Sequence, residues 1–157
     1  MPTKEPERQL ADFIAKFSPE VAKVICAARA KMRAFIPQTV ELVYDNYNFF
    51  VIGYGPNEKA GDAIFSLAAQ AKGINLCFLQ GAKLPDPYKL LRGSGNVVRN
   101  IRLESADALD DPKVRQLMDT ALKRAKSPIS ADGRHQLIIK SVSAKQRPRR
   151  SLIEKKK

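Results

Sequence analysis

The sequence predicts an α+β fold, with an antiparallel sheet of about five strands covered by helices and a flexible basic tail at the C-terminus. Apolar residues recur at helical spacing before Pro37 and after Asp111, whereas the residues between them alternate with the period of a strand. The turns between the predicted strands are short, which favours antiparallel pairing. Hydrophobic residues make up 44% of the 157 residues, enough for the core of one domain.

Two helices are predicted before the sheet. Residues 9–16 carry the apolar stripe of the first. Ser18 and Pro19 begin the second, because serine caps a helix and proline suits its first turn, and Pro37 ends it. We expect its basic residues, which lie outside the apolar stripe, to be solvated; they are Lys23, Arg29, Lys31 and Arg33.

Four strands follow in succession and are predicted to form two hairpins. Asp45-Asn46 is typical of the first turn and Lys72-Gly73 of the second. The predicted strands are residues 40–44, 47–54, 62–69 and 74–80.

The remaining predicted elements are a short helix over 85–92, a strand over 97–104, a helix that begins at Asp111-Pro112, and an edge strand over 136–142.

The pattern weakens after Pro128, so we place a boundary there, with residues 1–130 as the α+β domain and residues 131–157 as a basic, partly disordered extension. The net charge of the chain is +12, and residues 134–157 contribute nine Lys and Arg against one acid, a net charge of +8. Dense like charge with few apolar residues indicates flexibility. No core position is expected after residue 142, so a deletion from Ser143 onward is expected to leave folding intact.

The segment 84–105 concentrates polar groups suited to an anion. Backbone N–H groups of a glycine-rich loop can form a concave anion site, which neighbouring cations close. In the strand after the loop, Arg99 alternates with apolar residues, so it needs a buried carboxylate or a ligand. A structural salt bridge is the alternative for Arg99. The predicted ligand-binding residues are Lys89, Arg92, Gly93, Ser94, Gly95 and Arg99.

The C-terminal cations suggest a second partner, nucleic acid, because clustered Lys and Arg can bind phosphates. The alternative is a solvated terminus that aids solubility. The body lacks aromatic stacking motifs on a basic strand, so sequence-specific RNA reading is not predicted. The predicted nucleic-acid-binding residues are Lys145, Arg147, Arg149 and Arg150.

Other function classes find little support in the sequence. No apolar run approaches the about 20 residues that span a bilayer, and the first residues lack the apolar core of a secretory signal. Cys26 and Cys77 fit no CxxC motif, which predicts two reduced, packed thiols in a cytoplasmic protein, with a disulfide or a reactive thiol as the alternative. His135, the only histidine, lies in the weakly patterned region. We expect no catalytic residue, no metal site, no cofactor and no membrane partner.

Several irregular stretches between residues 10 and 122 resemble the YdhG-like family of uncharacterised domains. They are VELVYDNYN at 40–48, SLAAQAKGINLCFLQGAKLPDP at 66–87, LLRGSG at 90–95 and IRLES at 101–105. The resemblance implies a frataxin-like α+β fold, and some relatives are described as iron chaperones. Iron sites need clustered carboxylates. The nearest group here, Asp107, Asp110 and Asp111, lies at a helix start, where carboxylates cap and offset the helix dipole.

The sequence therefore leaves three candidate functions open. They are a cytoplasmic, non-enzymatic protein that binds a small anion near the GSG loop, a nucleic-acid accessory protein that acts through its C-terminal cations, and an iron chaperone.

Overall fold

The computed structural model describes residues 4–150 and places helices on one side of a six-stranded sheet. The helices are α1 Lys4–Ile14, α2 Pro19–Phe35 and α3 Pro112–Arg124. The strands are β1 Val40–Asp45, β2 Phe50–Gly55, β3 Phe65–Gln70, β4 Gly73–Phe78, β5 Arg99–Leu103 and β6 Gln136–Val142. Three short 3-10 helices are η1 Ala60–Asp62, η2 Gly81–Lys83 and η3 Ala106–Asp110. The predicted α+β class is confirmed.

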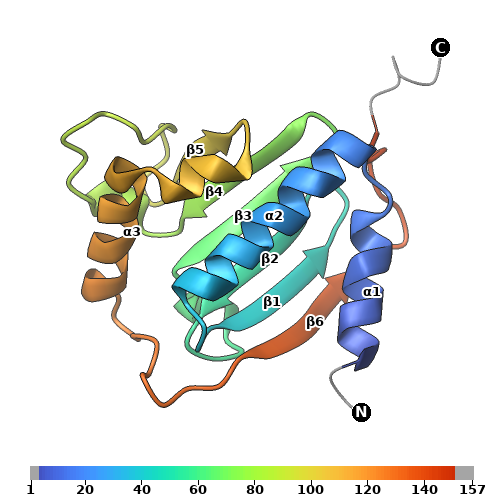
Figure 1. Cartoon of the computed structure of the whole chain (residues 1–157), viewed down its shortest axis with the longest axis horizontal. Coiled ribbons are helices and arrows are strands. Elements are labelled where there is room, and N and C mark those ends of the chain that lie inside the picture. Colours follow the sequence, from blue (N-terminus) through green and yellow to red (C-terminus); the bar gives the residue numbers. More distant parts are fainter. Residues whose placement is uncertain (1–3, 151–157) are drawn as a thin grey trace.

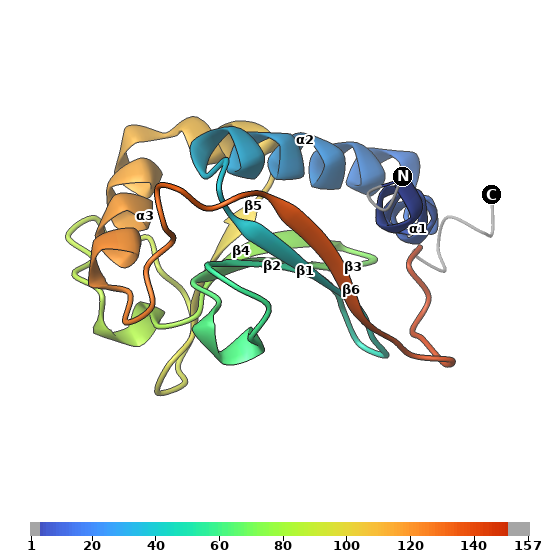
Figure 2. The ribbon, with the colours of Figure 1, turned by 90° about the horizontal axis from the view of Figure 1, so that it is seen from below.

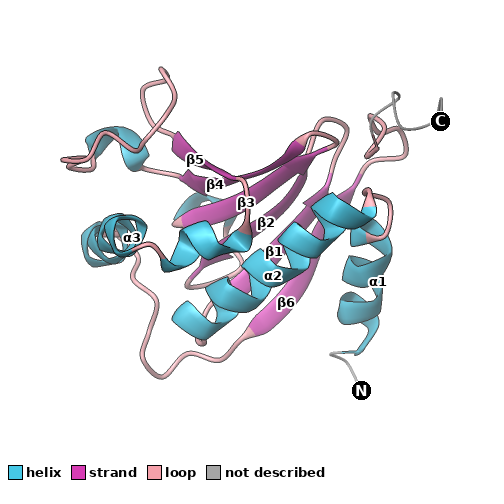
Figure 3. Ribbon diagram, turned by 45° about the horizontal axis from the view of Figure 1, so that its top comes forward, coloured by secondary structure: helices cyan, strands magenta, loops and turns pink. Residues whose placement is uncertain are grey.

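The strand order is β5-β4-β3-β2-β1-β6 (Figure 3). Neighbouring strands are antiparallel from β5 to β1, but β6 is parallel to β1. The prediction of an antiparallel sheet of about five strands is therefore wrong in strand number and in the direction of one strand. The chain leaves α3 near the end of the sheet where β1 begins, and residues 125–135 stay at that end (Figure 1). A strand that enters from there beside β1 must run parallel to it.

The core lies between the sheet and the helices. A row of register partners crosses the sheet on the face toward α2, and each is at most 2% exposed: Val43, Ile52, Leu67 and Leu76. From the helix side, α2 contributes Ile25, Ala28 and Met32. Figure 2 shows α1 and α2 on this face and η1 on the other. No helix of the described part is long and apolar enough to cross a membrane.

Local sequence signals begin two helices as predicted. The Ser18 hydroxyl accepts a hydrogen bond from the Val21 backbone N–H at 3.3 Å, and Pro19 starts α2. The Asp111 carboxylate accepts one from the Lys113 N–H at 2.8 Å, and Pro112 starts α3. Each cap satisfies a backbone donor that the first helical turn leaves unpaired.

The short helix predicted over residues 85–92 is wrong, because these residues form a loop. The Asp86 carboxylate accepts hydrogen bonds from the N–H groups of Leu90 and Leu91, both at 2.9 Å. Lys89 has φ 54°, a left-handed conformation that interrupts a helix. An aspartate that binds nearby backbone amides competes with the hydrogen bonds of the helix itself.

The C-terminal segment, defined as residues 143–150, packs against the body of the protein beside the start of α2 (Figure 1). The Ser143 N–H donates to the Asp45 carbonyl and the Arg147 N–H to the Tyr47 carbonyl, both at 2.9 Å. Arg149 is 5% exposed. The expectation of a flexible tail without core positions is wrong for this segment, because β6 ends beside β1 and delivers it to the β1–β2 turn. Residues 151–157 lie outside the described residues.

Candidate functional site

A cavity of about 350 Å³ lies where the C-terminal end of α3 meets η1, η2 and the end of β4. Its apolar lining comes from Ile64, Phe78, Leu84 and Ala121. Phe78 is fully buried, and Ile64 and Ala121 are at most 9% exposed, so the floor of the cavity belongs to the core. Its volume is at the lower end of the range of about 300–1,000 Å³ that is typical of small-molecule pockets.

Charged side chains line the same cavity. Lys83, Arg124 and Lys126 are exposed, and within residues 4–150 none of them forms an ion pair. Asp62 is the acid in the lining, and its carboxylate accepts a hydrogen bond from Asn57 Nδ2 at 3.0 Å. The cavity therefore has an apolar floor and a net positive rim.

A close backbone approach forms one wall of this cavity. A Cβ atom added at Gly55, at the end of β2, would lie 2.8 Å from the Cα of Ala63, too close for any side chain. The absence of a side chain at Gly55 lets Asp62 and Ala63 lie directly against the end of β2. This contact holds η1 in place opposite α3.

The residues predicted to bind an anion do not line this cavity. Five of them are exposed in the loop between η2 and β5: Lys89, Arg92, Gly93, Ser94 and Gly95. Figure 2 shows the yellow tip of this loop projecting from the sheet on the side opposite α2. Gly93 has φ +118°, a backbone conformation that favours glycine. Anion binding at the GSG loop stays a prediction.

Arg99, the sixth predicted residue, bonds back to its own loop. Its Nη1 donates to the Val98 carbonyl at 2.9 Å and also to the Gly95 carbonyl. The alternation along the strand predicted a buried carboxylate or a ligand, but Arg99 is half-exposed at the start of β5 and needs neither. Its Nη1 atom therefore binds the backbone of its own loop, and an anion contact by Arg99 stays a prediction.

The four predicted nucleic-acid-binding residues separate into two kinds. Lys145, Arg147 and Arg150 are exposed. Arg149 instead donates from Nη2 to the Asp45 carboxylate at 2.8 Å and to the Asn46 carbonyl at 2.6 Å. Its side chain is 3% exposed, so it is not accessible to phosphate.

A second group of charges lies under α2, and the sequence pattern missed it. The Glu41 carboxylate on β1 is fully buried and accepts hydrogen bonds from Arg29 Nη2 at 2.8 Å and His135 Nε2 at 2.7 Å. Because a carboxylate only accepts, Nε2 carries the proton of this bond. Arg29 also binds Glu7 on α1 at 2.9 and 3.0 Å.

These contacts correct two predictions. Arg29 was expected to be solvated, but its side chain is 15% exposed. His135 was expected in a weakly ordered region, but it binds the buried Glu41 carboxylate and its side chain is 20% exposed. The available signal was Glu41 itself, a carboxylate within an apolar strand, which requires a cationic or hydrogen-bonding partner.

The shared charges shift the pKa of neighbouring groups. Burial opposes the charge of Arg29, but the hydrogen bonds that it donates to Glu41 and Glu7 outweigh burial and raise its pKa above its ordinary value. Burial, with the charge of Glu41 adding to it, raises the pKa of Tyr54 well above its usual range. The Tyr54 hydroxyl is buried without a well-formed hydrogen bond among the described residues. None of its residues lines the cavity beside α3, and its buried carboxylate is fully paired, so we interpret the cluster as structural.

Glu7 provides a test of this cluster by pH. The hydrogen bond from Arg29 lowers the pKa of Glu7 below its ordinary value of 4.5, although partial burial opposes this. A depressed carboxyl pKa stabilises the fold above the ordinary value, and this stabilisation is lost as the pH falls through the folded-state pKa. We expect the difference in free energy of unfolding between the wild type and Glu7→Gln to be constant near neutral pH and to shrink below pH 4.5, measured by urea denaturation. A difference that stays constant in acid would contradict this.

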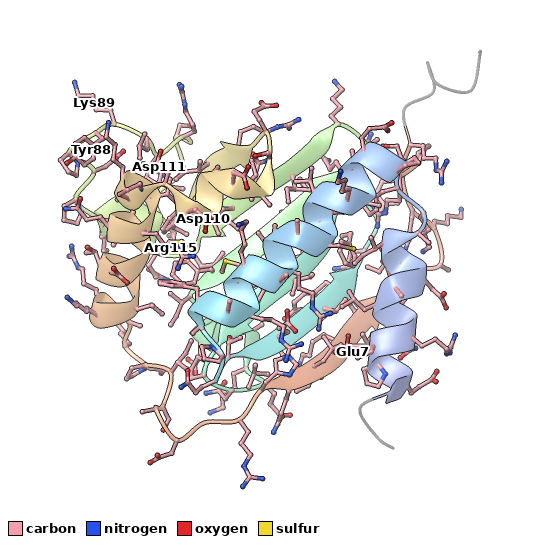
Figure 4. All side chains as sticks on the ribbon, in the orientation of Figure 1. Glu7, Tyr88, Lys89, Asp110, Asp111 and Arg115 are labelled. Atoms are coloured by element: carbon pink, nitrogen blue, oxygen red, sulfur yellow. The ribbon has the colours of Figure 1, made fainter. Side chains whose placement is uncertain are left out.

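The acidic group considered for iron is engaged in structural contacts. Asp110 binds Lys31, which was expected to be solvated, and lies 3.4 Å from Arg115 Nη2, while Asp111 caps α3. Figure 4 shows Asp110, Asp111 and Arg115 at the start of α3, far from Glu7 on α1. Within residues 4–150, no group of three or more His, Cys, Asp or Glu side chains is placed to hold a metal ion.

Both cysteines are free thiols. Cys77 is half-buried on β4, and burial raises the pKa of its thiol. Cys26 is exposed on α2, so the prediction that both thiols are packed is wrong for this residue.

No protein-family model, curated protein or solved structure matches this chain. The resemblance to the YdhG-like family stays a prediction from the quoted motifs, as do the frataxin-like fold and the iron-chaperone role that it implies.

Proposed function

We propose that this protein binds a small anionic organic molecule in the cavity between α3, η1 and η2. The observation that carries the proposal is the combination of an apolar floor with three rim cations, Lys83, Arg124 and Lys126, that have no acidic partner in the described part. The anionic ligand expected from the sequence is kept, but its proposed site moves from the GSG loop to this cavity.

The chemistry of the lining limits the ligand class. The apolar floor around Phe78 and Leu84 favours a hydrocarbon or aromatic portion, because burying apolar surface stabilises a complex. The three cations favour a carboxylate, sulfonate or phosphate at the rim. Asp62 would accept a hydrogen bond from a hydroxyl or amino group on the same ligand.

An aromatic sulfonate, 8-anilinonaphthalene-1-sulfonate (ANS), combines both features and fluoresces in apolar surroundings. We expect saturable binding to the folded protein. Arg124→Gln and Lys126→Gln should each weaken it about two- to fivefold, the effect of losing one solvent-exposed charge contact. Asp62→Asn should strengthen it, because this change removes the one negative charge of the lining. Fluorescence titration measures all of these affinities.

Lys123→Gln is the matched control, because Lys123 is an exposed cation next to Arg124 on α3 that does not line the cavity. Both cations also offset the helix dipole, so this control removes that shared effect. Ala125→Leu, which adds apolar volume to the lining, should abolish binding without unfolding the protein. Equal losses from Lys123→Gln and Arg124→Gln, or full binding by Ala125→Leu, would refute the cavity as the site.

A further inference from the structure

The β1–β2 turn brings exposed aromatic rings next to exposed cations of the C-terminal segment. Tyr47 is 51% exposed and Phe49 is 39% exposed, both in the tight turn closed by the hydrogen bond from the Asn46 N–H to the Phe49 carbonyl at 3.0 Å. The guanidinium of Arg147 lies 5.6 Å from the centre of the Tyr47 ring. We call the side chains of Tyr47, Phe49, Lys145 and Arg147 the turn surface.

The turn surface is held in place by specific contacts. Arg147 donates from Nε to the Asn48 side chain at 2.7 Å, in addition to its backbone bond to Tyr47. Two residues further on, the buried Arg149–Asp45 pair anchors the segment. The cations therefore lie beside the aromatic rings in the folded protein, although about 100 residues of chain separate Arg147 from Asn48.

The two stretches that form the turn surface, residues 44–50 and 141–150, expose only positive charge. Asp45 is the one acid in residues 44–50 and 141–150, and it is fully buried between Lys16 and Arg149. The exposed charges of these stretches are Lys145, Arg147 and Arg150. An anionic partner would meet no exposed carboxylate from either stretch.

We propose that the turn surface binds single-stranded nucleic acid. Aromatic rings beside cations stack on unpaired bases while the cations contact phosphates. Neutral hydrogen-bonding groups, the side chains of Asn48 and Gln70, lie next to the rings and can meet base edges. A duplex hides its base faces, so the exposed rings favour a single strand. An anionic membrane is less well matched, because insertion requires a broader apolar face than two half-exposed rings.

The test measures the fluorescence anisotropy of a short labelled oligo(dT), with a duplex of equal length as competitor. We expect Tyr47→Ala to weaken binding about five- to a hundredfold, the range for loss of one base–aromatic stack. Tyr47→Phe should retain it. Arg147→Gln should reduce the slope of log affinity against log salt by about 0.7, one phosphate contact on a single strand.

Tyr88→Ala is the matched control, since Tyr88 is 49% exposed and Lys113 lies 4.8 Å from its ring centre. Figure 4 shows Tyr88 on the opposite side of the molecule from α1. Unchanged melting temperatures confirm that each variant folds. Equal losses of oligonucleotide affinity for Tyr88→Ala and Tyr47→Ala would overturn the proposal, as would duplex binding as tight as single-strand binding. So would the absence of binding at low salt, or binding to phosphatidylserine vesicles without binding to the oligonucleotide.

Discussion

Deleting residues 143–157 is expected to lower the free energy of unfolding by about 3 kcal/mol or more, because it leaves a buried charge without its main partner. The Asp45 carboxylate is fully buried, and after the deletion only Lys16, at 2.7 Å, would contact it. The deletion also removes the hydrogen bond from Gln146 Nε2 to the Asp45 carbonyl at 2.7 Å. Urea denaturation of the full-length and shortened chains measures the difference.

Single substitutions separate the ion pair from the rest of the segment. Arg149→Met should account for most of the loss, whereas Arg147→Met, two residues away and exposed, should change stability by less than about 0.5 kcal/mol. The double variant Asp45→Asn/Arg149→Met should lose less than the sum of its single variants, because the two side chains are coupled. A shortened chain as stable as the full-length protein would show that the Arg149–Asp45 pair contributes nothing to folding.

Glu41→Gln is expected to destabilise the fold by about 3 kcal/mol, the scale for breaking a buried ion pair. The fully buried carboxylate accepts from both Arg29 and His135. An amide in its place removes the buried negative charge and presents an N–H₂ group to a donor, Arg29 Nε, from which Glu41 Oε2 accepts at 3.0 Å. Among the described residues, Glu7 is then the one carboxylate paired with Arg29. Denaturation at neutral pH measures this loss.

Glu7→Gln is the matched control, since Glu7 binds the same guanidinium but is 41% exposed. Its loss should be below about 1 kcal/mol, as for exposed pairs. Comparable losses for the two variants would show that burial of Glu41 does not set the strength of the cluster.

These two predictions reverse what the sequence suggested about the same residues. Arg149 was predicted to bind nucleic acid, and His135 was placed in a weakly ordered region. Arg149 is 104 residues from Asp45 in the chain, and His135 is 94 residues from Glu41. No local pattern specifies a pair at such separation, because it forms only when β6 docks beside β1.

The cavity could not be predicted from the sequence either. Its cations come from η2, α3 and the start of the connection to β6, and its apolar floor comes from β4 and α3. In the sequence, Arg124 and Lys126 are ordinary residues at the end of a helix. Only the packing of η1 against the end of β2 places Asp62 and an apolar floor next to them.

Local interactions along the sequence were sufficient to predict most of the helices and strands. Ser18-Pro19 and Asp111-Pro112 predicted the starts of α2 and α3, because caps act within one turn of helix. Strand periodicity predicted five strands to within a few residues, and residues 136–142 as a further edge strand, although the sheet was expected to have about five strands in all. The helix predicted over residues 85–92 is wrong, because the side chain of Asp86 binds the backbone amides of Leu90 and Leu91 there.

The chain thus carries in its local pattern the helices, the strands, the α+β class and a strong positive charge. Tertiary structure alone decided that β6 is parallel to β1, that Arg149 and His135 lie against buried carboxylates, and that Arg147 lies beside Tyr47. The physical reason is the separation in sequence over which each kind of interaction acts. Helix caps and hydrophobic periodicity depend on residues a few positions apart. The partners of Asp45 and Glu41 instead reach these carboxylates only when strands from distant parts of the chain pair.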